Sequence, residues 1–258
     1  MKAIFITSLT SSSDAPHSLA AQVKPYGIPV MGHFWIDDLR GMAWMGAREK
    51  LAEPETAVWV ILGSKKDFEK KEIRYGLSLL ALSVQSLRRS LLPVMILREG
   101  DEDISADDLP TPFKDARIFP FSGESLGVKL VAAANQPPTP VSREYYFDVL
   151  GNETIGQWFG IRPAEGAWTG AMLGVSGGNI LFHAVGPAGR LPDKTVLNYP
   201  LRGMTLALGD AEYTAWAAQN PVNPETAYYV KVENHPSSIL FGPYSDEDAA
   251  DVYVVKLA

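Results

Sequence analysis

The stretch VWVILGSKKDFEKKEI, residues 58–73, decides the fold class. Residues 57–62 form a continuous apolar run, which is the pattern of a strand covered on both faces. Gly63 and Ser64 end this strand, and one long helix is predicted from Asp67 to Ser90. Its apolar side chains recur at three- and four-residue spacing, at Ile73, Leu77, Leu80, Val84, Leu87 and Leu91. A buried strand that leads directly into a helix is the unit of a parallel sheet.

The rest of the first half repeats this alternation of strands and helices. Further strands are predicted at residues 2–7, 94–97 and 116–119, and a closing helix at 125–134. Strand, helix and strand at this spacing imply right-handed crossovers. The predicted fold class is therefore α/β, with a parallel sheet that carries helices on both faces.

The texture of the sequence changes near residue 135. Three prolines in the segment 135–140 predict a stiff linker, so we expect domains at 1–134 and 141–258. Short β-branched and aromatic runs predict strands at 145–150, 157–161, 180–185, 205–208 and 227–232. Helices are predicted at 211–219 and from Ser245 with Asp248, whereas the tail 252–255 fits a helix or a strand. We expect a smaller, β-rich α+β domain of unknown role.

The composition excludes several classes of protein. The chain has 258 residues, a net charge of -7 and no Cys. A negative charge disfavours nucleic-acid binding, and the lack of Cys excludes disulfides, thiolate zinc sites and Cys nucleophiles. No apolar run reaches the length of a transmembrane helix, and the first residues predict a buried strand in preference to a signal peptide. The expected location is cytoplasmic, without a membrane partner.

Several segments of the first half occur in the order and spacing of a TIR domain, the Toll/interleukin-1 receptor module. The segments that carry this resemblance are Ile4–Ser8 with a polar loop to Asp14, Phe34–Gly41 as second strand and acidic loop, Val60–Ser64 with Phe68 and Glu72, Leu92–Leu97 as fourth strand, and Leu109–Pro110. The chain departs from the family pattern in a short first helix within residues 18–24, which Pro25 ends, and in the charged Lys65 and Lys66. The resemblance covers residues 1 to about 125 and implies a flavodoxin-like fold there.

The resemblance implies a catalytic role for Glu72. In catalytically active TIR domains, a Glu at the matching position serves cleavage of the nicotinamide–ribose bond of NAD. Breaking this bond creates an oxocarbenium-like cation on the ribose, and a carboxylate at the ribose face stabilises it. The resemblance thus implies an NAD hydrolase or cyclase of bacterial signalling or defence, with NAD as substrate and with no separate cofactor or metal.

Five more residues are expected to contact the substrate: Ser8, Trp35, Asp38, Ser64 and Phe68. An aromatic ring can hold a flat base, and Trp44 is a further candidate that fits a core position equally well. Serines after strands can bind ribose or phosphate, but they are also ordinary turn residues. An Asp in a turn likewise needs no ligand.

Other interpretations of the same residues stay open. Glu72 also fits a solvated helix position among Glu69, Lys70 and Lys71. The TIR-like domain could be a non-catalytic association module that joins like domains, with a ligand-sensing or oligomerising second domain. A nucleoside deoxyribosyltransferase-like enzyme is a third hypothesis. The segment Gly174–Gly178 predicts a hairpin turn, and the acidic run 99–103 predicts a solvated loop.

Overall fold

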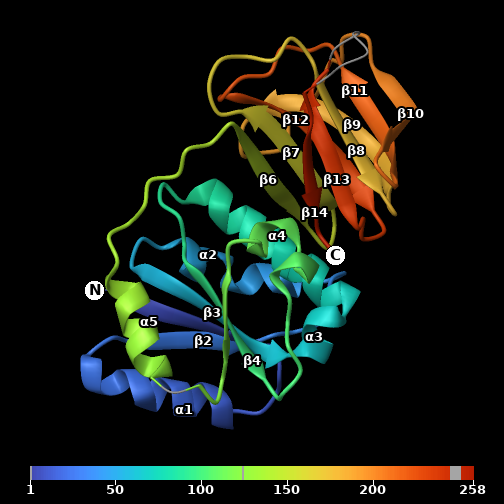
Figure 1. The fold of residues 1–258 in the computed structure, drawn as a ribbon. Coiled ribbons are helices and arrows are strands. Elements are labelled where there is room, and N and C mark those ends of the chain that lie inside the picture. The colour runs from blue at the N-terminus through green and yellow to red at the C-terminus, as the bar shows by residue number, and fades with distance from the viewer. Residues whose placement is uncertain (1, 124, 245–250) are drawn as a thin grey trace. The chain divides into compact units, whose positions relative to one another are not determined.

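The computed structural model describes residues 2–123, 125–244 and 251–258 (Figure 1). The chain divides into two compact units, Met1–Val141 and Ser142–Ala258. The first unit combines strands and helices, whereas the regular structure described for the second unit consists of strands.

The first unit is built on a five-stranded sheet of order β2-β1-β3-β4-β5, in which all neighbouring strands are parallel. Its strands are β1 (Ala3–Ser8), β2 (Val30–Phe34), β3 (Thr56–Ser64), β4 (Val94–Glu99) and β5 (Arg117–Pro120). The predicted parallel sheet is confirmed. The central strands β1 and β3 are apolar along most of their length, because helices cover both of their faces.

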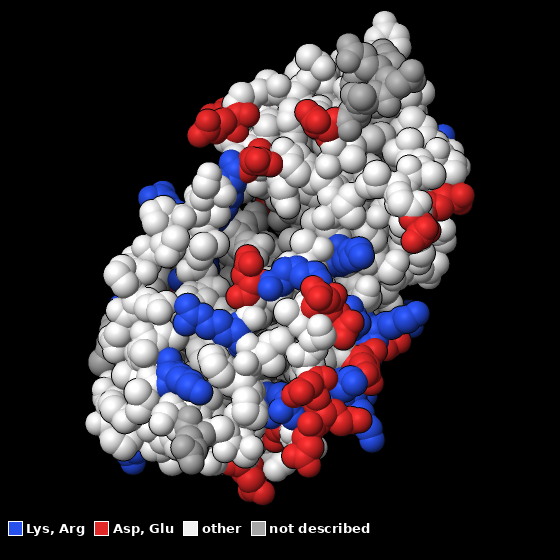
Figure 2. All heavy atoms as spheres, in the orientation of Figure 1, with Lys and Arg blue, Asp and Glu red and all other residues white. Residues whose placement is uncertain are grey.

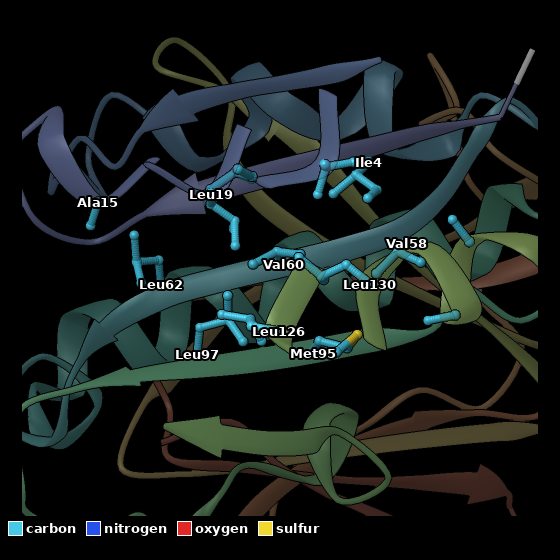
Figure 3. Packing of buried hydrophobic residues seen from close by; sticks show 14 residues of the cluster. Ile4, Ala15, Leu19, Val58, Val60, Leu62, Met95, Leu97, Leu126 and Leu130 are labelled. Carbon is cyan, nitrogen blue, oxygen red and sulfur yellow. The ribbon is translucent and has the colours of Figure 1, made fainter. Parts of the chain in front are cut away.

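Helices α1 (Asp14–Val23) and α5 (Leu126–Asn135) cover one face of this sheet. Figure 3 shows Leu19, Leu126 and Leu130 from these helices packed against Val60 and its neighbours on the strands. On the other face lie α2 (Arg48–Ala52) and α4 (Lys71–Leu87), which contact each other (Figure 1). The short helical segments are α3 (Lys65–Glu69), η1 (Lys24–Tyr26), η2 (Ala43–Ala47), η3 (Ala106–Asp108) and η4 (Thr111–Phe113).

The prediction of one long helix at 67–90 is wrong in one respect, because the segment forms two helices. Lys70 adopts an extended backbone, with φ −69° and ψ 120°, so α3 ends there and α4 starts at Lys71. The apolar spacing holds only within α4, which ends at Leu87. The break lies close to the Asp67 side chain, which is hydrogen-bonded to Ser64 before it and to Lys70 after it.

The second strand and the first helix also begin earlier than expected. We expected the second strand from Phe34, but β2 ends at this residue. Trp35, directly after β2, donates its N–H to Ser8 O on β1 at 2.8 Å. The mainly apolar segment 28–36 is longer than β2, so the sequence does not define which of its residues pair with β1. The helix α1 begins at Asp14, ahead of the expected 18–24.

The second unit consists of two antiparallel sheets of order β10-β11-β8-β13-β14 and β6-β7-β12-β9. Phe147 on the second sheet and Phe241 on the first have ring centroids 5.3 Å apart, so the two sheets pack face to face. The strands are β6 (Tyr145–Asn152), β7 (Gly156–Pro163), β8 (Ala171–Ser176), β9 (Asn179–Pro187), β10 (Leu201–Leu208), β11 (Ala211–Ala218), β12 (Thr226–Glu233), β13 (Ser238–Pro243) and β14 (Tyr253–Lys256).

The helix predicted at 211–219 is wrong, because this segment is strand β11. Its burial alternates with period two: Tyr213 and Ala215 are buried, whereas Glu212 and Thr214 are exposed. Alanines favour helices locally, but the alternation fits a sheet with one covered face. The predicted helix at Ser245 and Asp248 lies outside the described residues, and residues 142–244 and 251–258 contain no helix, so the α+β description is replaced by β.

The turn at Gly174–Gly178 is confirmed, but its strands do not form a hairpin. Gly177 has φ +75°, a backbone conformation that glycine adopts readily, and it leads from β8 into β9. These two strands belong to different sheets. The turn therefore carries the chain from one sheet of the unit to the other.

Among the described residues, no helix is both long and apolar enough to cross a lipid bilayer.

Candidate functional site

Polar side chains follow the strands of the parallel sheet at its carboxyl edge. Ser8 ends β1, Ser64 ends β3 and Glu99 ends β4, and Ser64 and Glu99 are neighbours in the strand register. In open α/β sheets, ligands bind beyond the carboxyl ends of the strands. This edge is therefore the candidate functional site.

Ser64 and Asp67 form a capping box at the start of α3. The Ser64 hydroxyl donates to Asp67 Oδ2 at 2.7 Å, and Lys70 Nζ donates to Asp67 Oδ1 at 2.9 Å. Burial alone would raise the pKa of Asp67, but these hydrogen bonds and the Lys70 charge outweigh it and lower the pKa. The Ser64 hydroxyl, predicted to bind substrate, is thus already engaged in holding α3.

Two acidic residues at this edge, Asp67 and Asp37, act on the Lys70 ammonium group. The hydrogen bond and charge of Asp67 raise the pKa of Lys70, and the charge of Asp37 adds to this effect. Asp37 lies on the loop after β2, next to Asp38, whose Oδ1 accepts from Gly41 N–H at 2.8 Å. Asp38 therefore shapes its own turn. Figure 2 shows side chains of both signs gathered over α3.

Glu72 is exposed in the first turn of α4. Gly76 lies four residues later on the same helix face. A Cβ atom at Gly76 would meet Trp35 Cζ2 at 2.7 Å and Leu39 Cδ2 at 3.1 Å, so the Trp35 indole occupies the space that this glycine leaves free. A carboxylate and an indole are thereby brought one helical turn apart on one face of α4.

The Trp35 indole has an unused hydrogen-bond donor. Its Nε1 is buried and has no hydrogen-bond partner among the described residues. The ring lies edge-on to His33, with centroids 6.4 Å apart. Buried donors are nearly always paired, so an unpaired one beside the carboxyl edge of the sheet is unusual.

The other two predicted aromatic residues lie in the interior. Phe68 is 7 % exposed and Trp44 is 1 % exposed. Neither ring is open to a ligand in this structure, and both pack as core side chains. Ser8 is also buried, and its hydroxyl donates to Thr10 O at 3.0 Å.

Glu99 was missed at the sequence level. It was assigned to a solvated acidic loop, but it extends β4 and is half-buried. Burial raises the pKa of Glu99, the Asp67 charge raises it further, and a hydrogen bond with Thr10 opposes the rise. The only signal in the sequence is its position two residues after the end of the buried run 94–97.

A buried hydrogen-bond chain lies under the same edge. Trp59 Nε1 donates to Thr7 Oγ1 at 2.9 Å, and Thr7 Oγ1 lies 3.0 Å from His33 Nε2. The Thr7 hydroxyl accepts from the indole and shares a second hydrogen bond with His33, whose direction depends on the tautomer of the imidazole. Burial lowers the pKa of His33, which keeps this imidazole neutral and able to accept.

The second unit holds its buried polar groups between and on its sheets. Arg202 Nε donates to His183 Nε2 at 3.3 Å, and His183 Nδ1 lies 2.9 Å from the Tyr228 hydroxyl. Burial and then the Arg202 charge lower the pKa of His183 to about 4. Asp148 and Arg162 form a buried ion pair on β6 and β7.

The described part of the chain contains no group of three or more His, Asp or Glu side chains placed to hold a metal ion. The sequence matches no protein-family model and no curated protein. The functional argument therefore depends on the geometry of the carboxyl edge.

Proposed function

We propose that the first unit binds NAD at the carboxyl edge of its sheet and cleaves the bond between nicotinamide and ribose. The observation that carries the proposal is the pairing of exposed Glu72 with Trp35 across Gly76 on one face of α4. The strand order β2-β1-β3-β4-β5 supports it, since flavodoxin-like sheets have this order and bind ligands at their carboxyl edge. The same order supports the resemblance to TIR domains.

In the proposed reaction, the C–N bond breaks and its electron pair leaves with nicotinamide, whose ring nitrogen becomes neutral. The ribose is left as an oxocarbenium-like cation, which the Glu72 carboxylate stabilises by its charge. Water or a hydroxyl of the substrate then adds to the ribose carbon, and its proton passes to Glu72 or to solvent. Addition of water gives hydrolysis, and addition of a substrate hydroxyl gives cyclisation.

The neighbouring side chains suit the remaining parts of the substrate. The half-buried Trp35 indole supplies a flat ring beside the proposed position of the base, and its Nε1 is a hydrogen-bond donor without a partner among the described residues. Lys66 and Lys71 have no ion-pair partner among the described residues, so they can offset the charge of a diphosphate.

The experiment compares NAD consumption by the full chain, by Glu72→Gln and by Glu69→Gln, with nicotinamide release followed by chromatography. Glu69 is an exposed carboxylate of α3 and serves as the matched control. We expect release by the wild type and the control, and a loss of at least about 100-fold in Glu72→Gln. Intact NAD with the wild type, or full activity in Glu72→Gln, would overturn the proposal.

The same assay includes deoxynucleosides as a second substrate class. Cleavage of deoxynucleosides with NAD intact would favour the deoxyribosyltransferase-like hypothesis. If both remain intact, a non-catalytic association module is favoured instead.

A further inference from the structure

Among the described residues, no strand lies next to the outer side of β2. Pro29 O accepts from Ile4 N at 3.0 Å, and Trp35 N donates to Ser8 O at 2.8 Å. The backbone groups of Pro29 and Trp35, which are odd-numbered, therefore face β1. Backbone groups of alternate residues in a strand point to opposite sides. Those of Val30, Gly32 and Phe34 therefore point outward, and none has a backbone partner among the described residues.

This edge lacks the features that usually prevent pairing. Segment 28–36 contains no Lys, Arg, Asp or Glu, and its only proline is Pro29, at its start. Phe34 is 45 % exposed and Ile36 is 65 % exposed. Natural proteins protect exposed edges with charges, prolines, bulges or covering elements. An uncharged edge with exposed apolar side chains indicates a surface that pairs.

Space for a partner's side chains lies along the same strand. A hollow of about 260 Å³ is lined by Ser8, His17 and the whole of β2. A second hollow of about 530 Å³ adjoins it at Val30 and runs along the end of α1. Both hollows are mainly apolar, so they suit aliphatic and aromatic side chains.

We infer that two copies of this chain associate through β2, antiparallel about a two-fold axis at Gly32. This register places outward-facing Val30 of one copy opposite Phe34 of the other, and Ile28 opposite Ile36. Every cross-strand pair on that face is then apolar, and the two-fold axis passes between the Gly32 residues of the two copies. The inference does not depend on the proposed NAD cleavage.

Charge favours a second copy as the partner. The first charged residue before the segment is Lys24, and the first ones after it are Asp37 and Asp38. All three are exposed. An antiparallel two-fold arrangement brings Lys24 of each copy toward residues 37–40 of the other, whose net charge is -1 with the exposed Arg40 included, so one surface complements itself.

The dimer is tested by sedimentation equilibrium of the full chain from about 1 to 100 µM, a range suited to a small interface. We expect the mass to rise from one chain to two. Phe34→Lys and Ile36→Lys put a charge into the seam and should keep the protein monomeric. Val128→Lys, at an exposed apolar residue of α5, is the matched control and should still dimerise. A wild-type monomer throughout, or dimers that persist in both edge variants, would overturn the inference.

The register is tested separately, because the natural chain has no Cys. In the proposed register Met31 lies opposite His33 of the other copy, in the pair type with the shorter Cα separation of about 4.5 Å. An equimolar mixture of Met31→Cys and His33→Cys should form disulfide-linked dimers, and each variant alone much less. Equal cross-linking in all three samples, or none in the mixture, would exclude this register. Circular dichroism of each variant checks that it is folded.

Discussion

The two units place their polar side chains in different positions. At the carboxyl edge of the first unit, Asp67 is buried after the end of β3, Glu99 is half-buried at the end of β4, and Glu72 is exposed in the first turn of α4. In the second unit, the ion pair of Asp148 with Arg162 and the hydrogen-bonded pair of His183 with Tyr228 lie along the strands themselves, and all four residues are buried.

This difference indicates what each set of polar groups does. Polar groups paired within a sheet have their hydrogen bonds satisfied, and breaking one pair leaves the other group buried and unpaired. At the edge of the first unit, Asp67 is engaged by Ser64 and Lys70, whereas Glu72 is exposed, contributes less to stability and remains available for a ligand. Stability should therefore respond strongly to changes along the strands of the second unit and weakly to changes at the edge of the first.

The largest effect is expected at the buried ion pair. Asp148→Ala leaves the Arg162 guanidinium without its carboxylate, and such a change costs about 3–5 kcal/mol. Hydrogen exchange of peptides from β6 and β7 measures this locally, so it does not require the two units to unfold together. Glu153→Ala, in the exposed turn of the same pair of strands, is the control and should change little. Equal effects of the two substitutions would contradict the comparison.

The next effect is a pH dependence from His183. Its pKa is about 4 in the folded protein and about 6.5 in an unfolded chain, so the unfolded chain binds more protons between these values. Stability should fall as the pH drops from 6.5 to 4, by up to about 1.4 kcal/mol per pH unit. Exchange of β9 and β12 peptides across this range measures the slope. His183→Gln removes the titrating group, and an unchanged slope in that variant would refute the assignment.

A smaller effect is expected from the capping box of α3. Ser64→Ala removes the acceptor for Asp67 N–H and a donor to Asp67 Oδ2, and loss of an N-cap costs about 1 kcal/mol. Exchange in residues 64–70 should rise while the core strands keep their protection. Ser64→Thr preserves the hydroxyl and should restore protection, which a purely steric effect would not produce.

The smallest effect is expected at Glu72. The side chain is exposed, so Glu72→Gln should change the stability by less than about 0.5 kcal/mol. Thermal unfolding of the full chain measures this. A large destabilisation would show that Glu72 stabilises the first unit, and it would contradict the difference in stability contribution that we infer between the polar groups of the two units.

The parallel sheet of the first unit could be predicted because its strands are long apolar runs separated by helical spacing. The run 57–62 is short and ends at Gly63 and Ser64, which favours a strand, and the spacing in α4 is helical. Lys70 could not be predicted as a break, because residues 65–71 contain no proline or glycine that would interrupt a helix. The edge strand β2 was misplaced because its apolar run fits several registers.

The candidate site was predictable in part. Trp35, Asp38 and Glu72 lie at the expected edge, but their relation depends on Gly76, which attracts no attention in the sequence. Phe68 was expected to face a substrate, but an aromatic ring fits a core position as well, and Phe68 packs inside. In the second unit, β11 was predicted as a helix because Asp210 fits a helix cap before it, whereas pairing with β8 and β10 decides its structure.

The crossing at Gly177 between the two sheets has a consequence for how the chain folds during synthesis. Strand β8 pairs with β11 and β13, both of which are made later, and not with β9, which follows it at once. At about 5–20 residues per second, β8 waits several seconds for its neighbours. The first unit closes its sheet from strands that are complete by Pro120, so it can fold while the second is still being translated.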